Sequence, residues 1–281
     1  MANIQTEYKH DARVLARELY DIAKGWLAVS LLCKLLAFMV GAVAIFLSAF
    51  SQQAPFFVAI LSAAAELLVL RSDTYRGIAE AVRRKVDLQE SFGWNISRAE
   101  MSDLLVKTPS KIRKRIETQT SSEPYFDSKE ATGPRRALEN TRESAWWSKH
   151  LAERIGQIYL IVMITLVAIS LVVLIISIQT IQNFDVLSNI GRIVTATVML
   201  IFSLSLIRMT IGYYKFSQIS ARIEEQAEQL LNNGSNDSVQ AVKVMNEYHL
   251  ARATAPMIPT WVWKWMRNDL YELWKSYRSS P

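Results

Sequence analysis

The chain has 281 residues, of which 51% are apolar and 21% are charged, and its formal net charge is +6. This composition excludes an ordinary soluble domain unless the two classes are segregated, and four nearly charge-free blocks do separate the charged segments. A single cysteine, Cys33, excludes a disulfide framework or a thiolate metal cluster within one chain. We attribute the positive charge to membrane topology and anionic lipid rather than to DNA or RNA.

The four apolar blocks predict four membrane-spanning helices. A span needs about 20 apolar residues to cross a hydrocarbon core of about 30 Å. The second block is short, but its helical pattern continues past Arg71. The connectors at 51–54 and 179–189 are short enough to make each consecutive pair an antiparallel hairpin. The predicted spans are Trp26–Phe50, Pro55–Leu70, Ile155–Ile178 and Ile190–Tyr214.

Lysine and arginine counts predict the orientation of these spans. Residues 1–24 hold four, residues 71–154 hold seventeen and residues 208–281 hold nine, whereas the connector at 51–54 holds none. Because these residues are enriched in cytoplasmic segments, we expect both termini and the central segment to be cytoplasmic. The N-terminus opens with a charged 24-residue stretch, so we expect no cleavable signal peptide.

The fold class is therefore all-α: an integral membrane protein with four transmembrane helices as two hairpins and with helical cytoplasmic extensions. Its predicted parts are an amphipathic helix (1–24), the first hairpin (25–70), a central helical and loop segment (71–154), the second hairpin (155–214) and C-terminal helices (215–281).

Local signals divide the polar segments further. Val14, Leu15, Leu19 and Ile22 form the apolar face of the first helix. A charged extension of the second span runs through 72–92 until Gly93, and the capping box Ser97–Glu100 opens a short helix. A basic run, 111–115, follows Pro109, and 118–134 is predicted as a loop. Pro134 suits the first turn of the helix that leads into the third span.

Beyond the fourth span we expect a helix to Leu231, another at 238–254, and a last helix at 261–277. The last helix places Trp263, Met266, Leu270 and Trp274 on one face. This face predicts packing on the protein, and the alternative is a helix that lies among lipid headgroups, where Trp and Tyr are favoured.

Polar residues within the spans are the first candidates for function. Small residues repeat along the first span beside Lys34 (Ser30, Ala37, Gly41, Ala44 and Ser48) and along the second beside Glu66 (Ala59, Ser62 and Ala63), which predicts a closely packed hairpin. Counting from the connector places Lys34 one turn nearer the cytoplasm than Glu66, and their side chains lean apart. We therefore expect no ion pair: Lys34 would extend to the headgroups, and Glu66 would be protonated, paired across subunits or in contact with water.

The fourth span is the most polar. Thr197, Ser205, Arg208 and Gly212 would share one face, and Thr195, Ser203 and Thr210 another. Such a helix suits a pore lining or a helix–helix contact. The chain has none of the common phosphate-binding, dinucleotide-binding, zinc or nucleophile motifs, so we expect no enzyme, no catalytic residues, no metal and no cofactor.

Three sequence patches resemble those of a known family. They are Leu70–Asp73 with Arg83 and Arg84, Gly133–Asn140 leading to Glu143–Lys149, and Tyr248–Arg252 followed by Ala255–Pro259 and Leu273–Trp274. With the paired hairpins they resemble the SMODS-associated four-transmembrane effectors of bacterial conflict systems, to which pore formation is ascribed. The resemblance implies an antiphage effector of the inner membrane, encoded beside a nucleotidyltransferase that makes cyclic oligonucleotides.

We therefore expect a homo-oligomeric, membrane-disrupting effector whose cytoplasmic part binds a cyclic nucleotide. An anionic nucleotide needs cationic and stacking groups. The central segment offers both, in Arg113, Arg115, Tyr125, Phe126, Arg135 and Arg136. A solvated basic loop facing lipid explains the same residues more simply. The principal alternative function is a membrane scaffold that recruits a partner through the aromatic C-terminal helix.

Overall fold

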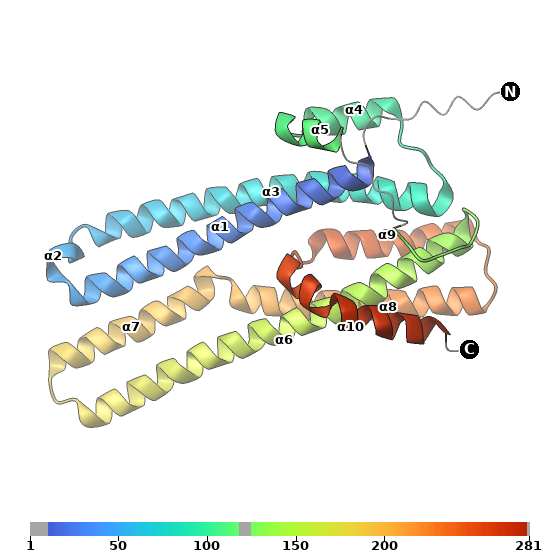
Figure 1. Cartoon of the computed structure of the whole chain (residues 1–281). Helices are drawn as coiled ribbons and strands as arrows, with labels where there is room; N and C mark the ends of the chain where they lie inside the picture. The colour runs from blue at the N-terminus through green and yellow to red at the C-terminus, as the bar shows by residue number, and fades with distance from the viewer. Residues whose placement is uncertain (1–10, 118–124, 280–281) are drawn as a thin grey trace. The chain divides into compact units, whose positions relative to one another are not determined.

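The computed structural model describes residues 11–117 and 125–279, and every regular element within these ranges is an α-helix (Figure 1). The predicted all-α class is thus confirmed. The helices are α1 (Ala12–Phe46), α2 (Ser48–Ser51), α3 (Ala54–Phe92), α4 (Arg98–Val106), α5 (Ser110–Ile116), α6 (Pro134–Thr180), α7 (Phe184–Ser203), α8 (Leu206–Asn232), α9 (Ser238–Thr254) and α10 (Thr260–Ser279).

Four stretches of helix are long and apolar enough to cross a membrane: α1, α3, α6, and α7 with α8. The most apolar stretch is in α6, where the mean hydropathy reaches 3.1. Each helix also exceeds the length that a bilayer needs: the 39 residues of α3 extend about 58 Å at 1.5 Å per residue. The first predicted boundary, at residue 24, falls inside α1, so the amphipathic helix and the first span are one helix.

Two short turns form the two hairpins. After α1, Leu47 leaves the helical region (φ −107°, ψ 94°), and the four residues of α2 precede α3. Between α6 and α7, the side chain of Asn183 accepts hydrogen bonds from the backbone N–H groups of Asp185 and Val186 at 2.9 and 3.4 Å. Asn183 therefore caps α7. Figure 1 shows α3 antiparallel to α1, and α7 antiparallel to α6.

The fourth span is not the single helix that was predicted. It breaks between α7 and α8, where Ser205 has a φ of +55°, a conformation that residues other than glycine seldom adopt. The amide of Ser205 turns back to the carbonyl of Phe202 (2.9 Å) before the helix resumes. The predicted polar faces, which counted through this point, are therefore wrong.

The chain divides into two compact units, and the division falls within several of the long helices. We call them the polar unit (Met1–Lys24, Ser72–Lys149 and Gln218–Thr254) and the membrane unit (Gly25–Arg71, His150–Ser217 and Ala255–Pro281).

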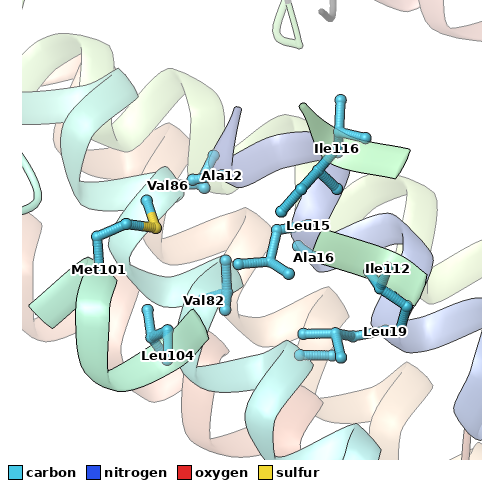
Figure 2. Close-up of a cluster of buried hydrophobic side chains, with 12 residues drawn as sticks. Ala12, Leu15, Ala16, Leu19, Val82, Val86, Met101, Leu104, Ile112 and Ile116 are labelled. Carbon is cyan, nitrogen blue, oxygen red and sulfur yellow. The ribbon is translucent and has the colours of Figure 1, made fainter. Parts of the chain in front are cut away.

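One apolar cluster of the polar unit joins the beginning of α1 to α3, α4 and α5 (Figure 2). It includes Leu15 and Leu19, as the sequence predicted, and Val82 and Val86 of α3. Ile112 and Ile116 show that the basic run after Pro109 is a short amphipathic helix, because they lie four residues apart and both enter the cluster. The other members are Ala12, Val14, Ala16, Ala79, Met101 and Leu104.

In the polar unit, a turn residue ends α3 and a capping box begins α4, as predicted. Gly93, with a φ of +72°, follows the last residue of α3. At the start of α4, the hydroxyl of Ser97 accepts from the amide of Glu100 (3.3 Å), and the amide of Ser97 donates to the Glu100 carboxylate (3.0 Å). The predicted capping box is confirmed.

The buried face of α10, in the membrane unit, differs from the prediction. Leu270 and Trp274 are buried as expected, and Val262 joins them. Trp263 instead remains 39% exposed, with the guanidinium of Arg267 5.2 Å from the centre of its ring.

Candidate functional site

Lys34 and Glu66 form an ion pair within the membrane unit, with Nζ and Oε1 2.9 Å apart. The expectation that they would not pair was wrong because it placed the turn of the hairpin too late. The α1 helix already ends at Phe46, and the hydroxyl of Ser30 donates to the carbonyl of Ala65 (2.9 Å). On this register Lys34 lies nearer to the turn than Glu66 does. Since helical side chains lean toward their own N-terminus, the two therefore lean together.

The same ammonium group reaches the break in the fourth span. Lys34 Nζ donates to the backbone carbonyl of Ser203, the last residue of α7, at 3.1 Å. The last carbonyls of a helix have no partner within it, and leaving one unsatisfied in a bilayer costs several kcal/mol. Lys34 thus satisfies the broken helix end while Glu66 neutralises its charge. We call Lys34, Glu66 and Ser203 the intramembrane clamp.

The two charged members of the clamp differ in exposure. The side chain of Lys34 is only 13% exposed, whereas that of Glu66 is 68% exposed. Ala59, Ser62 and Ala63 share the exposed face of α3 with Glu66, so the prediction that they pack within the hairpin was wrong. Between residues 54 and 70 of α3, the buried small residues are Ala54 and Ala65 instead. In the first span, Ser30 and Ala37 are buried as expected.

The predicted polar residues of the fourth span are divided by its break. Thr197 lies on α7 and donates its hydroxyl to the carbonyl of Ile193 (3.0 Å), one turn back in its own helix. Ser205 lies in the break, half-buried, and Arg208 is exposed on α8. Thr195 and Thr210 also donate to carbonyls one turn back. Hydroxyl groups bonded in this way need no partner on another helix.

In the polar unit, α3 and α9 share a buried network of charges that the sequence analysis did not assemble. Asp87 accepts from Arg252 Nη1 at 3.0 Å and lies 3.1 Å from His249 Nε2. Arg83 Nε is 3.0 Å from the second carboxylate oxygen of Asp87. Arg252 Nε also donates to Glu80 at 3.0 Å. We call these five residues the charge network.

Burial and neighbouring charges shift the pKa values of the charge network in opposite directions. Burial raises the pKa of Asp87, but the neighbouring Arg83 and Arg252 guanidiniums outweigh it and hold that pKa well below its usual range. Burial likewise lowers the pKa of Arg252, and Asp87 overrides that effect, so the pKa is raised. Burial raises the pKa of Tyr20 well above its ordinary value. Near pH 7, the Asp87 carboxylate and the Arg83 and Arg252 guanidiniums therefore stay charged. The phenol of Tyr20 stays neutral.

Aromatic groups surround the charge network. The guanidinium of Arg83 lies 3.6 Å from the ring centre of Tyr125, within the range of a cation–π interaction. Tyr248 and Ser148 share a hydroxyl hydrogen bond of 2.8 Å. A small cavity with room for about one water molecule lies beside Asp87. Its lining residues are Asp87, Ser91, Phe126, Asn140, Thr141, Ser144, Met245, Tyr248 and His249.

Comparison with known proteins identifies the family. The family model described as the SMODS-associating 4TM effector domain matches residues 5–273. The chain belongs to the SMODS-associating 4TM effector family. Neither the curated proteins nor the solved structures contain a match. The four apolar helices of this 4TM effector agree with the description of its family, and they make it a multi-pass membrane protein.

Three of the four arginines that were predicted to bind a nucleotide lie beside carboxylates in this 4TM effector. On α5, Arg115 donates to Glu18 at 2.7 Å, and Arg113 is exposed. Arg135 pairs with Glu130 at 3.1 Å. Arg136 donates to the backbone carbonyl of Glu130 at 3.0 Å and also lies 3.8 Å from Glu90.

The aromatic members of the same predicted set lie elsewhere. Tyr125 contacts Arg83, and Phe126 is buried beside the small cavity. The two rings meet edge to face, 4.7 Å apart. A signal for the charge network was present in the sequence: Glu80, Arg83 and Asp87 recur at three- and four-residue steps, as residues on one helix face do.

Proposed function

We propose that this 4TM effector disrupts the membrane that it spans by forming a gated, homo-oligomeric pore as part of bacterial antiphage defence. Membership of the family supports a membrane effector of conflict systems. The observation that carries the pore proposal is the intramembrane clamp, because a broken span held by a charged side chain from another hairpin is an element that can rearrange. The proposed action requires no catalysis.

The orientation and the signal are part of the same proposal. The lysine and arginine counts support an inner-membrane protein with both termini in the cytoplasm. The gating signal would be a cyclic oligonucleotide that binds the polar unit. Its phosphates would compete with the carboxylates of Glu130 and Glu90 for Arg135 and Arg136, since guanidinium groups bind either anion through similar hydrogen bonds.

Glu66 supports assembly from several copies. A carboxylate in a bilayer is costly, and its exposed face carries Ser62 and two alanines. Small residues allow helix backbones to approach closely. A second copy of the chain on this face would remove the Glu66 carboxylate from lipid.

Dye release from liposomes tests the pore. Full-length protein is reconstituted into dye-loaded liposomes, and cyclic oligonucleotides are added one at a time. We expect release with the cognate ligand, and release without ligand from the Lys34→Met variant. The Ser30→Ala variant is the matched control, because it loses a hydrogen bond within the same hairpin and leaves the Lys34 partners in place. Intact liposomes with every ligand and every variant would refute the proposal.

The alternative function is a scaffold that recruits a partner protein. It is favoured by the exposed aromatic residues of α10, including Trp261 and Trp265. Induced expression separates the two functions. A pore predicts toxicity with depolarisation that Glu66→Ala or Thr197→Ala relieves and that removal of the chain after Pro259 does not. A scaffold predicts the opposite pattern.

A further inference from the structure

The α10 helix is attached to the ends of membrane spans. Arg154 directly precedes the apolar block Ile155–Ile178, and its guanidinium lies 5.2 Å from the ring centre of Trp265 on α10. Arg71 directly follows the first hairpin, and its guanidinium lies 5.5 Å from the ring centre of Trp26, near the hairpin's beginning. Cation–aromatic pairs at span ends are typical of headgroup depth, where Trp side chains gather. The pair with Arg154 is therefore consistent with headgroup depth for α10.

The segment that leads into α10 is held at the end of the fourth span. The hydroxyl of Tyr213 donates to the backbone carbonyl of Met257 at 2.7 Å. Next to Tyr213, Gly212 lies so near Pro256 that an added Cβ would come within 2.8 Å of the proline ring. Both residues belong to the last turn of the apolar block Ile190–Tyr214. The ends of the third and fourth spans thus hold the first half of α10 and the segment that leads into it.

The charges of α10 are segregated around its axis. At about 100° per residue, its basic residues Lys264, Arg267, Lys275 and Arg278 fall within an arc of about 80°. The acidic residues Asp269 and Glu272 lie outside that arc, on the other flank of the helix. All four basic side chains are exposed. The buried face, with Leu270 and Trp274, lies between the two flanks.

Aromatic rings accompany the basic arc. The Arg267 guanidinium lies 5.2 Å from the ring centre of Trp263, and Lys275 Nζ lies 4.3 Å from that of Tyr271. Trp263 and Tyr271 are both partly exposed. Lys275 is also 3.7 Å from Glu272, but both side chains are more than half exposed, so the pair is weak. We call the four basic residues with Trp263 and Tyr271 the headgroup stripe.

We propose that the headgroup stripe binds the phosphate groups of anionic phospholipids. Amphipathic helices with Lys, Arg and Trp bind bilayer surfaces in this way, and the charge of the stripe is complementary to the anionic leaflet. The helix would thereby hold the end of the fourth span at a fixed depth, and it would make the protein sensitive to the lipid composition.

Lipid-specific quenching tests the assignment on the full chain. In a Cys33→Ser background, Asn268→Cys, an exposed position beside the stripe, carries a fluorophore. Liposomes contain phosphatidylcholine or phosphatidylglycerol with a quencher on the headgroup. We expect stronger quenching by phosphatidylglycerol. Removing one basic residue should lower this preference by up to about fivefold. A label at Val239→Cys, an exposed position of α9 in the polar unit, should not be quenched.

Charge variants test whether the basic residues produce the preference for phosphatidylglycerol. Replacing Lys264, Arg267, Lys275 and Arg278 by Gln should abolish it, whereas the matched variant Asp269→Asn with Glu272→Gln should retain it. Equal quenching by both lipids, or a preference that survives the loss of all four charges, would overturn the proposal. Loss of quenching when a soluble cyclic dinucleotide is added at constant ionic strength would assign the stripe to the nucleotide, and that too would overturn it.

Discussion

Replacing Lys34 by Met tests whether the clamp holds the break in the fourth span. Met has a similar length but neither charge nor donor, so the Ser203 carbonyl loses its 3.1 Å hydrogen bond. Interhelical hydrogen bonds in membranes contribute about 0.6–1.7 kcal/mol, and bonds from charged donors about 1.5–3 kcal/mol. A loss of about 1–2 kcal/mol would raise the open fraction of this segment about 5–30-fold.

The overall stability should change much less. A lysine within a span costs about 2.5–3.5 kcal/mol on insertion scales, and its removal recovers that cost. The variant also loses the attraction between Lys34 and the Glu66 carboxylate, which lies 2.9 Å from Nζ. The two effects oppose each other, so the variant should still insert and fold.

Hydrogen exchange in nanodiscs measures this prediction. The amides of residues 204–209 should exchange about 5–30-fold faster in Lys34→Met than in the wild type, and Ser30→Ala should leave them unchanged. If exchange in this segment is the same in Lys34→Met and the wild type, the clamp does not hold the break and the reasoning is refuted.

Three further predictions concern packing and charge. Asp87→Ala leaves two buried guanidiniums without their shared anion and should destabilise the polar unit by about 3–5 kcal/mol in thermal unfolding; an unchanged midpoint would contradict this. The folded-state pKa of Asp87 is depressed, so the stabilising effect of its carboxylate should be complete at neutral pH and be lost as pH falls below about 4. Acid unfolding of the wild type, compared with Asp87→Ala, would measure this loss. Gly212→Ala places a Cβ 2.8 Å from the rigid ring of Pro256 and should lower the stability of this contact by about 1–3 kcal/mol. The expected result is faster proteolysis of α10. The control Gly191→Ala, whose added Cβ has no neighbour within 4 Å, should have no such effect.

Local and compositional signals predicted most of the fold. The four spans were evident because each is an unbroken apolar run, and Gly93, the Ser97–Glu100 capping box and Pro134 each marked a helix end through their own backbone chemistry. The break at Ser205 was not predictable in this way. Neither Gly nor Pro stands between α7 and α8, and the carbonyl that the break exposes is satisfied by a residue 169 positions away in the sequence.

The candidate sites were predicted less completely because they too depend on residues that are far apart in the sequence. Lys34 and Glu66 stood out as ionisable residues within apolar blocks, but their pairing depends on the register of the hairpin. The α1 helix ends earlier than the connector suggested, which reversed that register. The charge network joins Asp87 to Arg252, 165 residues apart. Helical spacing places Asp87 on a face with Glu80, but no local pattern indicates which distant helix packs there.

The charge network has a consequence for the electric field of the protein. Its formal charges cancel, since the carboxylates of Glu80 and Asp87 balance the guanidiniums of Arg83 and Arg252. A neutral cluster interacts strongly at contact distance, but its potential decays steeply within a few ångströms. The formal surplus of +6 therefore belongs to other residues of the chain. An approaching polyanion would be attracted by those side chains and would be nearly unaffected by the arginines inside.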